Sequence, residues 1–148
     1  MEIGPLTVES QPKQEDVQFL EDRLHEYNDV QTGITDGQLL ALFIRDAQHI
    51  IRAGLAGWTW GGCCYIRYLW VHEALRGQGY GTHLMQAAEQ EAAARGCHQV
   101  LLDTHSFQAP AFYQHLGYEV FAVLDEYPRH HQNYYLRKRL PCVLHRGA

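Results

Sequence analysis

The sequence lacks the features that mark membrane proteins, duplex nucleic-acid binders and secreted proteins. Its longest uninterrupted apolar run covers only residues 39–44, far short of the ~18 residues that a membrane span needs. The formal net charge is -5, whereas a protein that binds duplex nucleic acid usually presents a basic stripe. The N-terminus has neither the basic segment nor the apolar stretch of a signal peptide. We therefore expect a protein with no nucleic-acid partner and no membrane association.

The cysteines are wrongly spaced for a disulfide framework. The four cysteines show no CxxC spacing: Cys63, Cys64, Cys97 and Cys142. Adjacent strand residues point to opposite faces, so a bond between the first two is not expected. We interpret the four as reduced thiols of a cytoplasmic protein, with a zinc site as the weaker alternative.

No metal site is predicted at His130 and His131, because adjacent histidines lack the i, i+4 geometry of two ligands on one helix face.

Length and hydrophobic periodicity predict a single mixed α/β domain over residues 1–148. A chain of 148 residues buries roughly 68–70% of its unfolded surface, which is enough for a core. The predicted order is β-α-β-β-β-α-β-α-β-β, without repeats. Strands are expected at residues 3–9, 39–45, 49–60, 63–71, 99–103, 118–124 and 133–140. Helices are expected from residue 12 to residues 27–28, from residue 81 to residue 95, and over residues 111–116.

The most informative segment is a glycine-rich loop between a predicted strand and a predicted helix, residues 76–81, RGQGYG. Its glycines allow the backbone N–H groups to form one concavity, and the helix N-terminus adds about half a positive charge. The loop therefore suits an anion such as pyrophosphate, with Arg76 adding charge-assisted contacts. A Walker loop and a dinucleotide fingerprint are both excluded, because Thr82 stands where each needs another residue. A turn that only connects strand and helix is the alternative.

Two motifs together resemble those of the GNAT acyltransferase superfamily. The loop is similar to the family's [QR]xxGx[GA] pattern, with Arg76, Gly79 and Gly81 at the defining positions. Residues 71–75 resemble the strand end and turn that precede it. Residues 111–118, AFYQHLGY, resemble the second family signature, a short helix that reads FYxxLGY. One amphipathic helix and one strand separate the two motifs, as is typical of the family, and the resemblance is strongest over residues 38–140.

The resemblance implies a fold and a co-substrate. The fold is α+β, a mixed and mostly antiparallel central sheet flanked by helices, with a splayed central strand pair. The co-substrate is acetyl-CoA, with its pyrophosphate on the glycine loop and its pantetheine along the preceding strand. The residues assigned to it are Leu69, Trp70, Val71, Arg76, Gly77, Gln78, Gly79, Tyr80, Gly81 and Thr82. Many relatives also use an asparagine before the tyrosine helix; in this chain Ser106 and Gln108 stand in that loop instead.

The implied reaction is direct transfer of an acetyl group to a primary amine of a small molecule or peptide. The resemblance implies that Tyr113 is the acid that protonates the departing thiolate. The alternative interpretation of Tyr113 is an aromatic residue of the core. An alkylamine has a pKa of ~10 and must lose a proton before it attacks. Asp103 is the first candidate base, Glu73 the second and His72 the third. Asp103 is equally suited to a strand-end cap or ion pair, and Glu73 to a turn residue without a catalytic role.

The acceptor amine is expected to contact the first helix, its loop and the central hairpin. The candidate residues are Tyr27, Asn28 and Trp60. An acidic wall would favour a cationic amine, in the same direction as the net charge. Family members are often dimers, so a homodimer is a further expectation. The competing functional hypothesis is a non-catalytic acyl-CoA-binding or sensor domain that retains the loop without an acceptor site.

Overall fold

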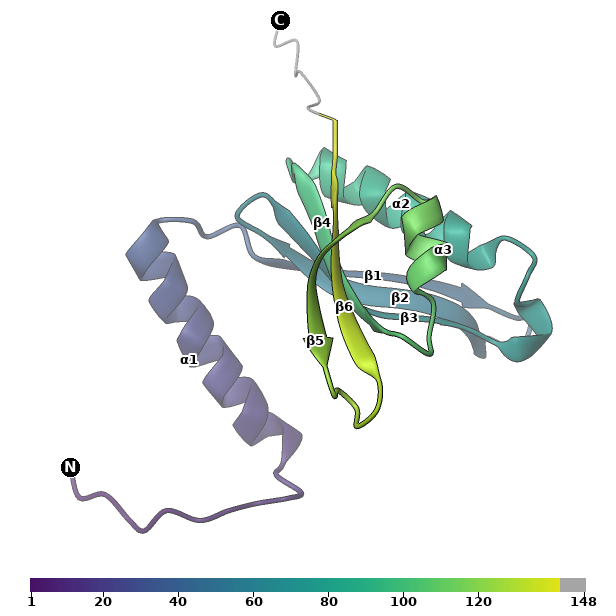
Figure 1. The fold of residues 1–148 in the computed structure, drawn as a ribbon. Helices are drawn as coiled ribbons and strands as arrows, with labels where there is room; N and C mark the ends of the chain where they lie inside the picture. The colour runs from purple at the N-terminus through teal and green to yellow at the C-terminus, as the bar shows by residue number, and fades with distance from the viewer. Residues whose placement is uncertain (142–148) are drawn as a thin grey trace, which may run out of the picture. The chain divides into compact units, whose positions relative to one another are not determined.

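The computed structural model describes residues 1–141, within two compact units, Met1–Thr35 and Asp36–Ala148 (Figure 1). The first unit contains the helix α1 (Gln14–Thr32). This helix runs past residues 27–28, where its end was predicted, and stops at Gly33, whose φ of 69° closes it with an N–H bond to the Asp29 carbonyl. A left-handed glycine is a common helix end, and Gly33 is the first glycine after the helix begins. Cys142 lies outside the described residues.

The strand predicted for residues 3–9 is not formed, and this prediction was wrong. These residues have no regular secondary structure. Their alternation of apolar and polar side chains is a property of strands, but a strand also needs a neighbour to which its backbone can hydrogen-bond. The first unit contains no other strand that could serve as this neighbour.

No helix among residues 1–141 is long and apolar enough to cross a membrane.

The second unit is built on a six-stranded sheet with the order β1-β2-β3-β4-β6-β5. Its strands are β1 (Gln38–Arg45), β2 (Ile51–Trp60), β3 (Cys63–Val71), β4 (Gln99–His105), β5 (Glu119–Asp125) and β6 (Gln132–Arg139). All neighbours pair antiparallel except β3 and β4, which are parallel. The mixed, mostly antiparallel sheet is therefore confirmed, and its strands begin and end within two residues of the predicted positions.

Two turns explain where the first strands begin and end. Asp46 accepts hydrogen bonds from the backbone N–H groups of Gln48 and Ile50, and His49 takes a left-handed φ of 62°. This side-chain-capped turn delays β2 to residue 51 instead of the predicted residue 49. The predicted hairpin at Gly61 and Gly62 is present, with φ values of 59° and 83°. Positive φ at both central residues matches the right-handed twist of paired strands.

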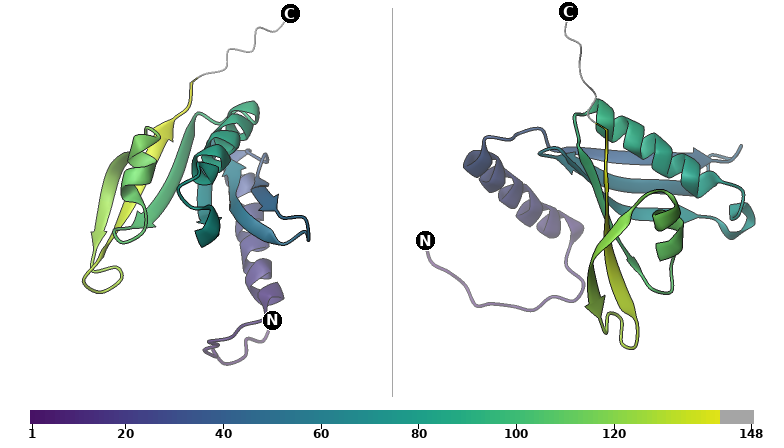
Figure 2. Two further views of the ribbon diagram at one scale, coloured as in Figure 1. Left: turned by 90° about the vertical axis from the view of Figure 1, so that its right-hand side faces the viewer. Right: turned by 45° about the horizontal axis from the view of Figure 1, so that its top comes forward.

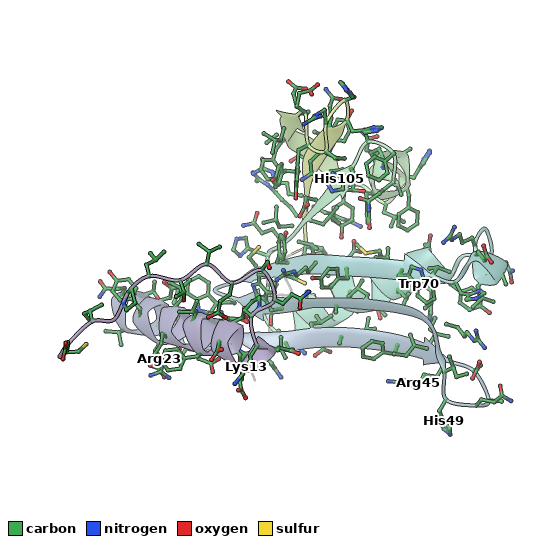
Figure 3. All side chains as sticks on the ribbon, turned by 90° about the horizontal axis from the view of Figure 1, so that it is seen from below. Lys13, Arg23, Arg45, His49, Trp70 and His105 are labelled. Atoms are coloured by element: carbon green, nitrogen blue, oxygen red, sulfur yellow. The ribbon has the colours of Figure 1, made fainter. Side chains whose placement is uncertain are left out.

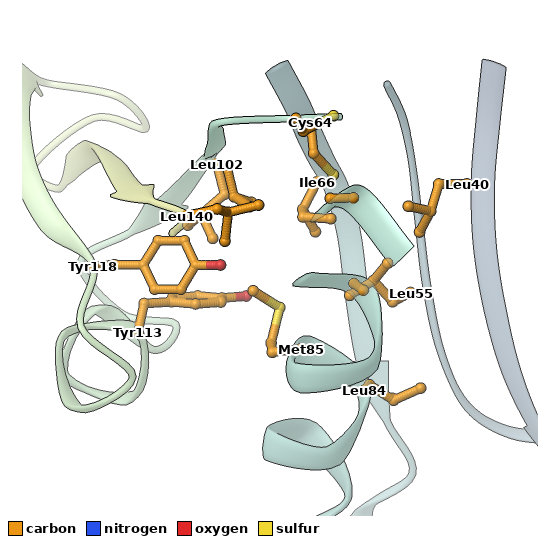
Figure 4. Close-up of a cluster of buried hydrophobic side chains, with 14 of the residues drawn as sticks. Leu40, Leu55, Cys64, Ile66, Leu84, Met85, Leu102, Tyr113, Tyr118 and Leu140 are labelled. Carbon is orange, nitrogen blue, oxygen red and sulfur yellow. The ribbon is translucent and has the colours of Figure 1, made fainter. Parts of the chain in front are cut away.

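Two helices cover the same face of the sheet. The helix α2 (Tyr80–Ala94) buries Leu84, Met85, Ala88 and Ala92, which lie on the one face that the helical period predicted. The short helix α3 (Pro110–His115) adds Tyr113 to the same core, next to Tyr118 and Met85 (Figure 4). Each fully buried large side chain in this core contributes about 1.5–3 kcal/mol. The core therefore holds α2 and α3 in fixed positions against the strands that they cover.

The central strands diverge in the middle of the sheet. The β3–β4 pairing covers only four residue pairs, from Cys63 with Gln99 to Ile66 with Leu102. Beyond this point β3 continues beside β2, whereas β4 continues beside β6, and the two groups of strands open away from one another (Figure 2). The divergence coincides with a bulge at Arg67, which has no partner in the β2 register. The splayed strand pair is thus present.

Gly57 allows the backbones of β2 and β3 to approach at this bulge. A Cβ at position 57 would lie 1.9 Å from the carbonyl oxygen of Tyr65. No real side chain fits at that distance, so any other residue has to push the two strands apart. Glycine in a strand often marks such a close backbone approach beside a bulge.

We expect Gly57→Ala to lower the free energy of unfolding by about 3 kcal/mol, because overpacking against backbone cannot be relieved by a rotamer change. Urea denaturation followed by circular dichroism measures the change. Gly4→Ala is the matched control, because nothing lies within 4 Å of a Cβ at that position. A Gly57→Ala protein as stable as the wild type would show that the strands can separate at the bulge without loss.

Candidate active site

A cavity of about 970 Å³ lies where β3 and β4 diverge. It is lined by the second half of β3, the glycine loop, the first turn of α2, the end of β4 and the start of α3. Figure 3 shows Trp70 on β3 and His105 at the end of β4, on the two strands that separate. Missing strand pairing leaves backbone groups without partners, so this opening can offer main-chain hydrogen bonds to an extended ligand.

The glycine loop forms one wall of the cavity. Gly77 and Gly79 have left-handed φ values of 73° and 87°, and no protein atom lies within 4 Å of a Cβ built on either. The space beside each glycine is open, and a side chain there would fill it. The first turn of α2 follows directly, and its Thr82 also lines the cavity. These glycines therefore leave room for a ligand against the backbone.

The N-terminus of α2 is available to an anion. The first hydrogen bond along the helix runs from the His83 N–H to the Gly79 carbonyl, so the preceding N–H groups have no acceptor within the helix. Gly79 provides no side-chain cap, and the first turn contains no acidic residue that would compete for these donors. The positive end of the helix dipole adds to their attraction for negative charge. This arrangement suits a phosphate or pyrophosphate.

Side chains of the loop itself and of the turn before it fix the shape of the loop. The Arg76 Nε donates to the Val71 carbonyl at 3.1 Å, and Gln78 Nε2 donates to the Ala74 carbonyl at 3.0 Å. His72 accepts a hydrogen bond at Nδ1 from the Ala74 N–H, which caps the 3-10 helix η1 (Glu73–Leu75). These bonds anchor the loop to the end of β3. Arg76 lines the cavity, whereas Gln78 does not.

The two sequence motifs are in direct contact. A Cβ at Gly81, in the first turn of α2, would lie 3.2 Å from the Phe112 ring of α3. Phe112 and its neighbour Tyr113 both line the cavity, with ring centroids 5.0 Å apart. The absence of a side chain at position 81 thus lets α3 pack closely on the start of α2. The loop motif and the tyrosine motif meet at one cavity although about 30 residues separate them.

Tyr113 lies at the inner side of the cavity. Only 8% of its surface is exposed, and its ring packs edge-on against Tyr118 at 6.0 Å. Burial, followed by the nearby Asp103 carboxylate, raises the pKa of Tyr113 to about 12. A phenol with this pKa is fully protonated at neutral pH and carries a proton that it can donate.

Asp103 reaches the cavity from the opposite face of the sheet. Its β4 neighbours Leu102 and Thr104 are buried on the helix-covered face, so the alternation of strand side chains places Asp103 on the other. Asp103 is half-buried and is the only carboxylate among the described residues that line the cavity. It accepts a hydrogen bond from the Tyr65 hydroxyl at 2.6 Å and one from Asn133 Nδ2 at 3.1 Å.

Of the other predicted site residues, some line the cavity and others do not. Gln108 lines the cavity, and its Oε1 accepts the His105 N–H at 2.8 Å, which caps the end of β4. Ser106 is outside the cavity wall, where its hydroxyl accepts the Gln132 N–H. Trp60 ends β2 at the hairpin, at the end of the strand opposite to the cavity. Glu73 is exposed on η1 and does not line the cavity. Tyr27 and Asn28 belong to α1, in the first unit.

Sequence reasoning missed several residues that form the site. Asn133 and Tyr65 hold Asp103 but carry no motif, because strand register, not spacing along the chain, brings them together. Phe107 and Arg67 line the cavity from the loop after β4 and from the bulge of β3. A bulge at residue 67 has one weak signal in the sequence, namely the glycine at position 57 on the neighbouring strand.

Together these features combine an anion cradle, a strand opening and a buried phenol in one cavity, which suits an enzyme that transfers a group from an anionic carrier. The comparisons with known proteins agree. The family model described as "Acetyltransferase (GNAT) family" matches residues 7–118. The chain therefore belongs to the GNAT acetyltransferase family, and it is an acetyltransferase of that family, whose members use acyl-CoA. The resemblance noted in the sequence is thereby confirmed.

Relatives are known by sequence and by structure. Acetyltransferase Atu2258 of Agrobacterium fabrum is 36% identical over 99 residues, which cover 67% of this chain and 72% of that protein. The blasticidin-S acetyltransferase of Streptomyces morookaense is 38% identical over 82 residues, or 53% of this chain and 58% of that protein. A crystal structure of an Agrobacterium tumefaciens acetyltransferase has a TM-score of 0.83 at 30% identity, covering 93% of this chain and 100% of that chain.

We expect Gly79→Ala to weaken the binding of coenzyme A by about tenfold or more, because a methyl group would occupy the cradle that the N–H groups form. Gly96→Ala is the matched control, since Gly96 has a similar φ of 83° and the same empty surroundings but follows α2 at its far end. Both variants should lose about 1–2 kcal/mol of stability through the strained φ. Calorimetric titration and thermal unfolding measure the two effects; equal affinity in both variants would contradict the assignment of the cradle.

Proposed function

We propose that this enzyme transfers an acetyl group from acetyl-CoA directly to the primary amine of a small molecule or peptide. One observation supports this most strongly: Tyr113 and Asp103 line the same cavity as the anion cradle. A proton donor and a proton acceptor are the two groups that aminolysis of a thioester needs. A non-catalytic acyl-CoA sensor, the alternative considered from sequence, is not retained, because the chain is an acetyltransferase of its family.

Acetyl-CoA would bind along the residues that line the cavity from β3 to α2. The N–H groups at the start of α2 and the Arg76 guanidinium suit its pyrophosphate. The backbone of residues 69–71, which has no β4 partner, suits the amides of its pantetheine arm. Gln108 stays in the proposal as a cavity residue, through its free amide nitrogen. We leave out Gln78 and Ser106, because neither lines the cavity.

Asp103 is the base in this proposal. Its carboxylate is the only one among the described residues of the cavity wall, and a carboxylate there suits an ammonium group electrostatically. Glu73 is exposed on η1 and does not line the cavity. The Nδ1 of His72 is already used to accept the Ala74 N–H. Both are therefore weaker candidates than Asp103.

The pKa of Tyr113 determines how it can act. Its pKa of about 12 is well above the ~8.5 of a thiol. Donation of a proton to the thiolate alone would therefore be unfavourable by about 5 kcal/mol. The transfer becomes favourable only when Tyr113 regains a proton in the same event. We therefore assign Tyr113 as a relay that passes a proton to sulfur and receives one from the nitrogen of the new amide.

The protons then balance over one turnover. Asp103 takes one proton from the ammonium form of the acceptor, and the neutral nitrogen attacks the acetyl carbonyl carbon. The carbon–nitrogen bond forms and the carbon–sulfur bond breaks. Tyr113 donates its proton to the departing sulfur and receives the second proton of the attacking nitrogen. The products are the acetamide, the thiol of coenzyme A and one proton, which Asp103 releases to water.

The first experiment is a calorimetric titration with acetyl-CoA, followed by a thiol-release assay with a panel of amines. Saturable binding is expected for acetyl-CoA, with no binding of ATP or NADH at the same concentration. The panel contains blasticidin S, spermidine, kanamycin and an alanyl peptide; the first is chosen because a relative is named for it. Thiol release above the hydrolytic background with at least one of them is expected. Failure of acetyl-CoA to bind would overturn the proposal.

We expect Tyr113→Phe to lower kcat by about 10²-fold, the lower end of what a positioned proton donor contributes. Its affinity for acetyl-CoA should change less than about twofold, because the ring and its packing remain. Tyr134→Phe is the matched control, since the Tyr134 hydroxyl donates to Gln132 Oε1 and this residue does not line the cavity. An unchanged kcat in Tyr113→Phe would exclude this residue from the proton transfers.

The described thiols are in keeping with a reducing compartment. Cys63, Cys64 and Cys97 are free, and burial raises the pKa of Cys64 to about 12. A thiol of this pKa is a poor nucleophile at neutral pH. These residues therefore favour direct transfer over an acyl-enzyme intermediate, and we place the enzyme in the cytoplasm.

A further inference from the structure

Both carboxylate oxygens of Asp103 are held by side chains from neighbouring strands. Tyr65 on β3 donates to Oδ1 at 2.6 Å, and Asn133 on β6 donates to Oδ2 at 3.1 Å. The three residues lie on three adjacent strands of the sheet, β3, β4 and β6. Two donors on different oxygens prevent the carboxylate from rotating about its last bond. Its remaining lone pairs therefore keep fixed directions.

The Asn133 side chain is oriented so that its amide donates to the Asp103 carboxylate, although its own oxygen then has no hydrogen-bond partner among the described residues. Its side chain is buried, with 1% of its surface exposed. Its Oδ1 is the one buried side-chain oxygen or nitrogen among residues 1–141 that has no partner. Turning the amide over would place this oxygen against Asp103 Oδ2, so that two acceptors would face one another. The unpartnered oxygen is thus a consequence of keeping the N–H donor on the carboxylate.

Ring packing and a close backbone contact also hold Tyr65 in place. Its ring packs on Trp58 with centroids 4.8 Å apart, and its carbonyl oxygen is the atom that Gly57 leaves room for. Burial and the hydrogen bond to Asp103 raise the pKa of Tyr65 to about 12. The phenol therefore stays protonated at neutral pH and remains a donor. The bond length of 2.6 Å is typical of an O–H donor on an ionised carboxylate.

We propose that Tyr65 and Asn133 are positioning residues that clamp the Asp103 carboxylate in the one orientation from which it meets the acceptor amine. This inference rests on the proposed role of Asp103 as base. Neither residue exchanges a proton in the reaction: each keeps its N–H or O–H on the carboxylate while Asp103 gains and then loses a proton on a free lone pair. Loss of either donor frees the carboxylate to rotate, which lowers the fraction of enzyme ready to react.

The first test observes the clamp in the free enzyme by proton NMR. The short Tyr65–Asp103 bond should give a hydroxyl proton resonance far downfield, identified by its loss in Tyr65→Phe and in Asp103→Asn. Asn133→Leu, which keeps a similar volume without a donor, should move this resonance. Tyr134→Phe should leave it in place, because Tyr134 bonds to Gln132 instead. Absence of the resonance in the wild type, or an unmoved resonance in Asn133→Leu, would contradict the clamp.

The second test asks whether the two residues act through Asp103. The probe is acetyl-CoA with the panel amine that gives the highest turnover, blasticidin S being tried first. Asn133→Leu and Tyr65→Phe should each lower kcat by about tenfold, with the KM for acetyl-CoA unchanged within about twofold. In the Asp103→Asn background the same substitutions should lower kcat by less than about twofold, because the group they position is no longer a base.

The outcomes separate the two proposals. Equal losses from Asn133→Leu in the wild-type and Asp103→Asn backgrounds would mean that Asn133 supports the fold alone, which overturns the clamp and leaves the base in place. Full activity of Asp103→Asn would overturn the base and the clamp together. Asn133→Leu removes both a buried unpartnered oxygen and the donor to Asp103 Oδ2, whose effects on stability oppose one another. The melting temperature of each variant is therefore measured beside its kcat, so that a loss of activity through unfolding is identified.

Discussion

The limited pairing between β3 and β4 is the constraint on which the rest of the site depends. Four residue pairs hold the two halves of the sheet together, and after Ile66 the strands separate. The paired residues keep the sheet continuous beneath the core, and the cavity opens where the pairing of β3 with β4 ends. The bulge at Arg67 and the backbone contact at Gly57 fix the position of this end. A sheet paired along its whole length would leave no free backbone for a ligand and no passage between its faces.

The opening brings together groups that a continuous sheet would keep apart. Tyr113 belongs to the helix-covered face and Asp103 to the opposite face, yet both line the same cavity. A reaction that needs a proton removed on one side and a proton delivered on the other suits this arrangement. The two groups also differ in how they are held. Tyr113 is fixed by aromatic packing, whereas Asp103 is fixed by hydrogen bonds from two strands.

The sequence allowed local features to be predicted well and long-range contacts poorly. The glycine loop, the tyrosine helix and the strands of the second unit were predictable, because each has a short-range pattern of glycines, turns or alternation. Asn133 was not, since its role depends on the register of β6 against β4. The strand expected at residues 3–9 shows the opposite error, an alternating pattern without a pairing partner. The aromatic group on the central hairpin suggested Trp60 as an acceptor residue, and the antiparallel course of β2 places it at the end of the hairpin away from the cavity.

The close packing of Phe112 on Gly81 links the two family motifs sterically. The ring of Phe112 fills the volume that a side chain at position 81 would take, so the two positions are steric complements. A larger residue at one demands a smaller residue at the other, and in related sequences they should covary as a pair. Phe112 directly precedes Tyr113 in α3, so a displacement of the Phe112 ring would reach the backbone that carries Tyr113.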